Sequence, residues 1–310
     1  MTIRFDGRVA IVTGAGAGLG RAHALGLAQR GARVVVNDFG AATDGGGGSV
    51  HPAEAVAEEI CAAGGEAMVS GADVSDLAQV EDMVAQAAAR WGSVDLLVAN
   101  AGILRDRSFA KMEPDDFAKV LAVHLVGTFN CCRGVWSGMQ ECGYGRIVLT
   151  TSGSGLYGNF GQANYGAAKA GIVGLMNVLA QEGRKSDIRV NAIAPNAATR
   201  MTEGLIPPDI LELLKPEAIT PAVLYLLSET APTRTIMGAG AGSFSIVRIV
   251  ESAGINLPED EWTPEAVAAR FAEIGDLAQA RQPRDAFDQL AGLIAQAAKR
   301  AGIKLPPLKP

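Results

Sequence analysis

The stretch that decides the fold is Val9-Ala10-Ile11-Val12-Thr13-Gly14-Ala15-Gly16-Ala17-Gly18-Leu19-Gly20, in which an apolar strand runs into a glycine-rich turn. Glycines permit a tight turn and let the backbone approach a phosphate, whose charge is stabilised by the free amides at a helix N-terminus. Tight packing of the helix on the strand is the alternative interpretation. Because the turn lies in the first strand-helix-strand unit, we predict a dinucleotide site formed by Thr13, Gly14, Gly16, Gly18, Leu19 and Gly20.

Asp38 ends the next apolar run, Val34-Val35-Val36-Asn37-Asp38, twenty residues after Gly18. A carboxylate at this place accepts hydrogen bonds from a ribose and repels a 2′-phosphate. Neither Ala17 nor Asn37 supplies a compensating positive charge. The alternative is an aspartate that merely starts a loop. We therefore expect NAD as the cofactor rather than NADP.

Apolar β-branched runs alternate with helical patterns along most of the chain, which is typical of a parallel sheet covered on both faces. We predict an α/β fold: a doubly wound, Rossmann-type parallel sheet of about seven strands with a helical C-terminal extension. The expected strands are 8–13, 33–38, 66–71, 94–100, 146–152, 188–193 and a seventh near 246–250. The expected helices are 18–30, 52–63, 77–91, 114–140, 163–184 and 216–228.

The tail differs from the body in its pattern. Thr263 and Pro264 have the character of an N-cap and a first helical residue, and a second amphipathic helix is expected at 284–299. Two such helices cannot bury their apolar faces alone, so we expect them to pack on the main body or on a partner subunit. The predicted domains are residues 1–255, for dinucleotide binding and catalysis, and the extension 256–310. The glycine-rich segment 40–49 is expected to be a mobile loop.

Several residues follow predicted strands at the carboxyl edge, where sheets of this type bind ligands. Asp73 and Val74 follow the third strand, and Asn100, Ala101 and Gly102 follow the fourth. We assign these five residues to the cofactor site. On physical grounds alone, either group could be only the turn that ends its strand.

Tyr165 and Lys169 stand four residues apart, on one face of a predicted helix, and Ser152 ends the strand before it. A tyrosine acting as a base near neutrality needs its pKa lowered by about three units, roughly 4 kcal/mol. One ammonium about 4 Å away, at an effective dielectric near 20, supplies about that much. We therefore expect Lys169 nearly to suffice, with a bound oxidised nicotinamide acting in the same direction. Ser152 can hydrogen-bond a substrate oxygen while Tyr165 exchanges its proton.

These motifs resemble the short-chain dehydrogenase/reductase family across roughly the first 250 residues: the glycine turn, Asn100-Ala101-Gly102, Ser152 and Tyr165-x-x-x-Lys169 occur in its order. The resemblance implies a tyrosine acid/base, a lysine that also holds the nicotinamide ribose, and a serine that positions the substrate. The stretches 100–109, 157–165 and 193–197, the glycine-rich loop and Thr263-Pro264-Glu265-Ala266-Val267 are most similar to the dehydrogenase part of the peroxisomal multifunctional enzymes of fatty acid β-oxidation, also described as 17β-hydroxysteroid dehydrogenases. Such enzymes oxidise (3R)-hydroxyacyl-CoA with NAD.

Two departures from the wider family concern the site. His124 stands where many members place an asparagine that anchors a water, so a relay role competes with simple helix packing. Pro195 and Asn196 replace a proline-glycine pair near the nicotinamide, and we include both in the cofactor site. Substrate specificity is expected from 156–162, 196–214 and the C-terminal helices. Arg105 and Arg107 could meet a coenzyme A phosphate or simply be solvated.

We expect a hydride transfer from a secondary alcohol, foremost a (3R)-3-hydroxyacyl-CoA, to NAD. The alternatives are a 17β-hydroxysteroid or other hydrophobic alcohol and, from another class, a non-catalytic NAD-sensing module. A homodimer or homotetramer is expected.

The 310 residues are 48% hydrophobic with net charge -6, and no basic block favours nucleic acid. No apolar stretch reaches about 18 residues and no signal-type segment begins the chain, so we expect a cytoplasmic protein without a membrane partner. The spacing of the cysteines suggests neither a disulfide nor a metal site. They are Cys61, Cys131, Cys132 and Cys142.

Overall fold

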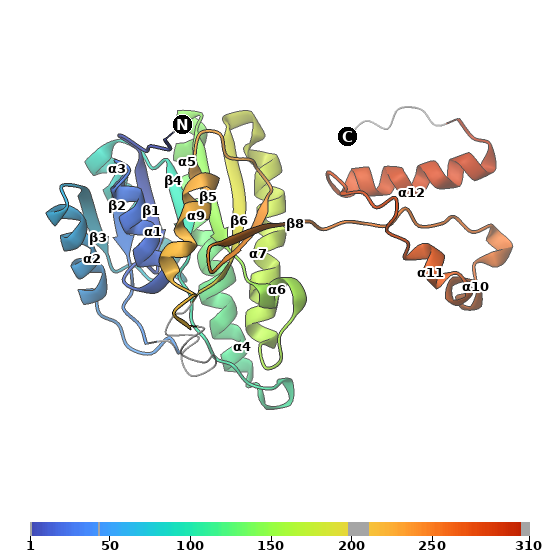
Figure 1. Cartoon of the computed structure of the whole chain (residues 1–310), viewed down its shortest axis with the longest axis horizontal. Coiled ribbons are helices and arrows are strands. Elements are labelled where there is room, and N and C mark those ends of the chain that lie inside the picture. Colours follow the sequence, from blue (N-terminus) through green and yellow to red (C-terminus); the bar gives the residue numbers. More distant parts are fainter. Residues whose placement is uncertain (1, 43, 198–210, 305–310) are drawn as a thin grey trace. The chain divides into compact units, whose positions relative to one another are not determined.

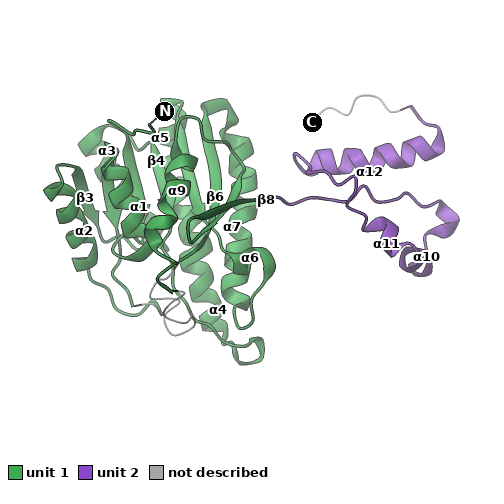
Figure 2. Cartoon of the chain, viewed as in Figure 1, with its two compact units in different colours: residues 1–247 green, residues 248–310 purple. Residues whose placement is uncertain are grey.

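The computed structural model describes residues 2–42, 44–197 and 211–304. They form two compact units, Met1–Val247 and Arg248–Pro310 (Figure 2). The expected domain boundary at residue 255 stays a prediction.

The first unit is built on an eight-stranded sheet in the order β3-β2-β1-β4-β5-β6-β7-β8 (Figure 1). The strands from β1 to β7 pair in parallel, and β8 runs antiparallel to β7. β1 and β5 are buried along their whole length, as expected of strands covered on both faces. The strands are β1 Val9–Thr13, β2 Arg33–Asn37, β3 Glu66–Ser70, β4 Leu96–Ala99, β5 Gly145–Thr150, β6 Ile188–Asn196, β7 Ile236–Gly240 and β8 Ser243–Val247.

The predicted α/β class is confirmed, but the seventh strand was misplaced. β7 was missed because its sequence, Ile236-Met237-Gly238-Ala239-Gly240, is poor in the β-branched and aromatic residues that mark strands. The residues assigned to a seventh strand, 246–250, instead contain the end of β8, which stops at Val247. Ala241 and Gly242 join the two strands with φ angles of 48° and 73°, the left-handed pair that a tight hairpin requires.

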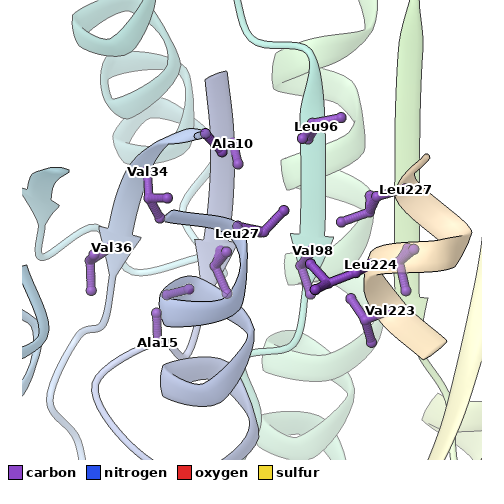
Figure 3. Close-up of a cluster of buried hydrophobic side chains, with 14 of the residues drawn as sticks. Ala10, Ala15, Leu27, Val34, Val36, Leu96, Val98, Val223, Leu224 and Leu227 are labelled. Carbon is purple, nitrogen blue, oxygen red and sulfur yellow. The ribbon is translucent and has the colours of Figure 1, made fainter. Parts of the chain in front are cut away.

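Helices cover both faces of this sheet. α1 Gly18–Ala28, α2 His51–Ala62 and α9 Thr220–Leu227 contribute to the core on one face, and α3 Leu77–Trp91, α5 Gly127–Cys142 and α7 Ala163–Glu182 to the core on the other. The first core joins Leu27 of α1 and Leu227 of α9 to Ala10, Val34 and Leu96 of the sheet (Figure 3). Burying one such large side chain stabilises the fold by roughly 1.5–3 kcal/mol.

The predicted helix 114–140 consists of three consecutive parts. α4 Pro114–Leu121 leads into a π-helical turn, Ala122–Val126, and α5 follows without a break. Shorter elements are the 3-10 turns Phe109–Lys111, Gly183–Ser186 and Pro216–Ala218 and the helix α6 Gly153–Tyr157.

The second unit contains a 3-10 turn, Glu259–Glu261, and the helices α10 Pro264–Ala269, α11 Phe271–Ile274 and α12 Ala286–Ala301. Thr263 caps α10 as predicted, because its hydroxyl accepts a hydrogen bond from the amide of Ala266 at 3.1 Å. Arg281 pairs with Asp288 and Glu251 inside the unit. Phe287 and Leu290 of α12 are exposed within the described residues.

Candidate active site

The glycine turn between β1 and α1 has the geometry that a dinucleotide requires. Gly14 has φ 65°, and a Cβ there would lie 2.9 Å from Cα of Ala101. A Cβ on Gly20 would lie 2.1 Å from the carbonyl oxygen of Gly14. α1 begins at Gly18, and its N-cap residue, Ala17, supplies no side-chain cap. The first amides of α1 therefore have no capping side chain and fit an anion such as a pyrophosphate.

Asp38 lies just beyond β2 and is tied to this turn. Its Oδ2 accepts a hydrogen bond from the amide of Gly16 at 2.8 Å, and its Oδ1 accepts one from Gly40 at 2.7 Å. Each carboxylate oxygen retains a second lone pair, so the side chain is held in place and can still accept a ribose hydroxyl. This arrangement fits NAD, because the same charge repels a 2′-phosphate.

The ends of β1 and β4 are joined beside the turn. The Thr13 hydroxyl accepts hydrogen bonds from the amides of Asn100 and Ala101 at 2.9 and 3.1 Å. In return, the Asn100 side chain donates to the carbonyl oxygens of Thr13 and Gly14 at 3.1 and 3.3 Å. These bonds hold the two strand ends at a fixed spacing, which keeps the cofactor side of the edge rigid.

Asp73 and Val74 lie after β3 and make contacts within the chain. Oδ1 of Asp73 accepts hydrogen bonds from the amide and the hydroxyl of Ser75 at 2.9 and 2.7 Å, so this carboxylate shapes its own turn. The carbonyl oxygen of Val74 accepts a hydrogen bond from the side chain of Asn130 at 2.9 Å. The role of both residues toward a cofactor stays a prediction.

Ser152, Tyr165 and Lys169 meet at the carboxyl end of β5. The Ser152 hydroxyl caps α6, accepting a hydrogen bond from the amide of Ser154 at 3.2 Å. Tyr165 and Lys169 lie one turn apart on α7, and Nζ of Lys169 is 5.5 Å from the centroid of the Tyr165 ring. The ammonium donates to the carbonyl oxygen of Thr150 at 2.6 Å.

The electrostatics of the chain alone differ from the sequence expectation. Burial raises the pKa of Tyr165; a hydrogen bond with Ser152 opposes this rise and the charge of Asp106 adds to it. Burial lowers the pKa of Lys169 to about 7, so its own charge is only half present near neutrality. The expectation that Lys169 alone nearly suffices to lower the pKa of Tyr165 was therefore wrong. The Lys169 ammonium donates to the Thr150 carbonyl oxygen, and burial is the largest influence on the pKa of the phenol.

His124 lies in the π-helical turn, and its ring packs against the ring of Tyr165. Its ring is 5.0 Å from the Tyr165 ring, edge to face, and its side chain is buried. Nε2 lies 3.0 Å from the amide nitrogen and 2.7 Å from the carbonyl oxygen of Ile103. Burial, with a smaller contribution from Lys169, lowers its pKa to about 3, so the ring is neutral. A Cβ on Gly102 would lie 2.2 Å from Cε1 of His124, so this glycine makes room for the ring.

The unused ring nitrogen of His124 is relevant to a relay. Nδ1 is buried and has no hydrogen-bond partner among the described residues, and the same holds for the hydroxyl of Thr150. Buried polar atoms of this kind are suited to holding an internal water. The sequence raised His124 as a candidate, but it gave no indication of the π turn that brings the ring to Tyr165.

Two arginines of the loop after β4 make contacts within the chain that the sequence did not indicate. Arg105 pairs with Asp116 at 2.9 Å and donates to the carbonyl oxygen of Asp44 at 2.8 Å, so its guanidinium is already engaged and does not fit the suggested contact with a coenzyme A phosphate. Arg107 is exposed, and its amide donates to Gly161 at 2.9 Å. The mobility expected for the segment 40–49 stays a prediction.

The other predicted site residues lie at the end of β6. Pro195 and Asn196 pair in register with Ala239 and Gly240 of β7, and the Asn196 side chain is exposed at the carboxyl edge. Most of the predicted specificity segment 196–214 lies outside the described residues.

The described residues contain no group of three or more His, Cys, Asp or Glu side chains arranged for a metal, and no helix among them is long and apolar enough to cross a membrane. The four cysteines are free, and burial raises the pKa values of Cys131 and Cys132.

A parallel sheet with a glycine turn at one strand end and a serine, a tyrosine and a lysine at another defines a dinucleotide-dependent oxidoreductase. The comparisons give the family. The family model described as short chain dehydrogenase matches residues 8–207, and the chain belongs to this family.

Two similar proteins are multifunctional enzymes. The chain is 46% identical over 296 residues to peroxisomal multifunctional enzyme A of Dictyostelium discoideum, covering 95% of this chain and 66% of that protein. The full-length peroxisomal multifunctional enzyme type 2 of Drosophila melanogaster aligns with a TM-score of 0.80 and 38% identity, covering 96% of this chain and 50% of that one. The chain thus spans two thirds or less of the length of these relatives.

A third similar structure shows the cofactor of a family member. A 7α-hydroxysteroid dehydrogenase, solved with NADH and 7-oxo glycochenodeoxycholic acid, aligns with a TM-score of 0.70 and 30% identity, covering 77% of this chain and 95% of that one.

Proposed function

We propose that the chain oxidises a secondary alcohol with NAD, and that its substrate is a (3R)-3-hydroxyacyl thioester of coenzyme A. The observation that carries the proposal is the meeting of Ser152, Tyr165 and Lys169 at the same sheet edge as the glycine turn. Similarity to the multifunctional enzymes over 95% of this chain supports the choice of substrate.

In the proposed mechanism, the Ser152 hydroxyl donates to the substrate oxygen while its own oxygen stays held by the Ser154 amide. Tyr165, as phenolate, takes the proton of the alcohol. Lys169, fixed by the Thr150 carbonyl, holds the cofactor ribose and stabilises the phenolate. Bound NAD would supply the acceptor for the hydride of the carbinol carbon and a positive charge in the site. Because burial raises the pKa of Tyr165 in the chain alone, we expect proton removal to depend on the bound cofactor.

The glycine turn, Asp38 and the residues after β4 would hold the dinucleotide. Amides of the first turn of α1 would bind the pyrophosphate and Asp38 the adenosine ribose. His124 would hold a water through Nδ1 and pass a proton from the Lys169 side of the site.

A second candidate substrate is a steroid-like alcohol. The 7α-hydroxysteroid dehydrogenase is 30% identical and was solved with an oxidised bile acid, which favours a hydrophobic polycyclic alcohol as the alternative. The non-catalytic NAD-sensing module remains the alternative from another class, and it predicts NAD binding without turnover.

One substrate panel separates these candidates. The purified chain is given NAD with (3R)- and (3S)-hydroxyacyl-CoA of several lengths and with 7α- and 17β-hydroxysteroids, and NADH formation is followed. We expect turnover of the (3R)-thioesters. Turnover of steroids alone would replace the substrate, and NADH binding without turnover of any alcohol would favour the sensing module.

Assembly and location are part of the proposal. We expect a homodimer or homotetramer, which sedimentation of the purified chain would measure. The cytoplasmic location stays a prediction, to be tested by fractionation, because the multifunctional relatives are named as peroxisomal proteins.

A further inference from the structure

Gln162 occupies a place that the proposed mechanism does not use. It is the N-cap residue of α7, three residues before Tyr165, yet its side chain does not cap the helix. Instead, the amide joins three separate segments: the loop after β4, the helix α6 and the loop between α6 and α7. A glutamine that connects three segments beside a reactive phenol has a role beyond ending a helix.

The amide of Gln162 is nearly saturated with hydrogen bonds. Its Nε2 donates to Oδ2 of Asp106 at 2.7 Å. Its Oε1 accepts hydrogen bonds from the hydroxyl of Ser154 at 2.7 Å and from the side chain of Asn159 at 3.0 Å. Both lone pairs of Oε1 are therefore used. Fixing such a flexible side chain costs conformational entropy, which these bonds offset.

Ser154 connects this network to the catalytic serine. Its amide donates to the Ser152 hydroxyl oxygen at 3.2 Å, while its own hydroxyl donates to Gln162. Gln162 thus acts on Ser152 through one intervening residue. Holding Ser154 fixes one lone pair of the Ser152 oxygen and thereby directs its proton.

Two further bonds attach the same loop to α7 and to the residue before its N-cap. Nδ2 of Asn164, which is fully buried, donates to the carbonyl oxygen of Arg105 at 2.9 Å. The amide of Arg107 donates to the carbonyl oxygen of Gly161 at 2.9 Å. The Asp106 carboxylate is therefore placed by backbone contacts on either side of it, and its final position depends on the bond from Gln162.

Three groups face the phenol of Tyr165 with charge or titratable atoms. Lys169 lies on the same helix, with Nζ 5.5 Å from the ring centroid, and the neutral His124 ring comes from the π turn at 5.0 Å. The third group is the exposed carboxylate of Asp106 in the loop after β4, whose charge acts on the phenol. Asp106 adds to the rise in the pKa of Tyr165, so where its charge sits affects how readily the phenol ionises.

We propose that Gln162 is a positioning residue, which fixes the Ser152 hydroxyl through Ser154 and fixes the place of the Asp106 carboxylate in the loop after β4. The role of Gln162 in turnover rests on the proposed function, the oxidation of a secondary alcohol.

The kinetic test compares two glutamine-aspartate pairs. Gln162→Met removes the amide at the site, and Gln86→Met removes an equivalent 2.7 Å bond to Asp82 on the exposed face of α3. We expect kcat to fall about fivefold to tenfold for Gln162→Met, with NADH affinity unchanged, and no change for Gln86→Met. Ser154→Ala should lower kcat similarly, and the double variant no further. Equal kcat in both glutamine variants, or fully additive losses, would overturn the proposal.

A second measurement needs no turnover, so it decides even if the wild-type chain oxidises none of the alcohols and the proposed function fails. The ultraviolet titration of Tyr165 is obtained in the presence of NAD as the difference between each protein and its Tyr165→Phe counterpart. Asp106→Asn should lower the midpoint by about half a pH unit, and Gln162→Met should lower it by less. Midpoints equal to that of the wild type in both variants would refute the positioning of Asp106.

Discussion

The two halves of the sheet's carboxyl edge are built by different means. On the cofactor side, the geometry comes from the backbone: glycines at 14 and 20 stand where a Cβ would meet main-chain atoms, and the amides of α1 are left uncapped. On the catalytic side, it comes from side chains: Ser152, Tyr165 and Lys169 depend on partners such as Ser154 and Thr150. A site built from the backbone loses binding when an added side chain takes up its space. A site built from side chains loses activity when a charge or the position of a proton changes.

The largest effect is expected on the catalytic side, where one atom can be removed without a clash. Tyr165→Phe should lower kcat by about a thousandfold, because it removes the group that takes the proton of the alcohol in the proposed mechanism, while NADH binding persists. Two quantities are measured: the turnover rate, and the binding of NADH followed by its fluorescence. Tyr225→Phe on α9 is the matched control and should match wild type. Retained turnover in Tyr165→Phe would contradict the mechanism.

On the cofactor side, adding one methyl group should be enough to disrupt binding. Gly20→Ala places a Cβ 2.1 Å from the Gly14 carbonyl, so the turn must shift. We expect NADH affinity to fall about a hundredfold and stability by about 1–3 kcal/mol. Gly138→Ala on α5, where nothing lies within 4 Å, should leave binding intact and stabilise the helix by up to about 1 kcal/mol. Equal NADH affinity in both variants would refute the steric account.

The sequence predicts the cofactor side of the sheet's carboxyl edge better than the side that carries Ser152, Tyr165 and Lys169. The backbone-built side was predictable because glycine spacing and a strand-end aspartate reflect steric and charge requirements at single positions. Ser152, Tyr165 and Lys169 could be named, but not the direction of the Tyr165 pKa, because burial and the bond from Lys169 to Thr150 arise only in the folded chain. β7 was missed because its sequence is poor in β-branched and aromatic residues, and the network of Gln162 because it depends on Asp106, which is distant in sequence.

A third change sharpens the comparison through charge on the cofactor side. Asp38→Asn keeps an acceptor oxygen for one of the Gly16 and Gly40 amides, loses the acceptor for the other, and removes the charge that repels a 2′-phosphate. We expect the preference for NAD over NADP to fall about tenfold, measured as the ratio of kcat/KM values. Asp82→Asn on the exposed face of α3 serves as the control. An unchanged ratio in Asp38→Asn would show that other groups select the cofactor.

The smallest effect concerns acid stability. Burial lowers the pKa values of His124 and His23 from 6.5 to about 3. As the pH falls, these two histidines become protonated in the unfolded chain before they do so in the folded chain. The stability that the two neutral rings contribute is therefore complete above pH 6.5 and is lost as the pH falls toward 3. Replacing either by Asn should reduce the slope of stability with pH by about 1.4 kcal/mol per pH unit in that window, measured by denaturant unfolding. His124→Leu, which cannot hold a water, should also lower kcat, whereas His23→Leu should not, because His23 bonds Thr220 away from the site.

The π-helical turn at 122–126 has a consequence for the register of the whole segment. A π turn holds one residue more than an α turn, so α5 is rotated by about 100° from the phase it would have if the helix were regular. Deleting a single residue there would restore regular winding. It would then rotate either α4 or α5 by about 100°, which turns its buried side chains away from their present packing partners. One extra residue thus lets a continuous helical segment pack α5 against the sheet and also place the His124 ring beside Tyr165.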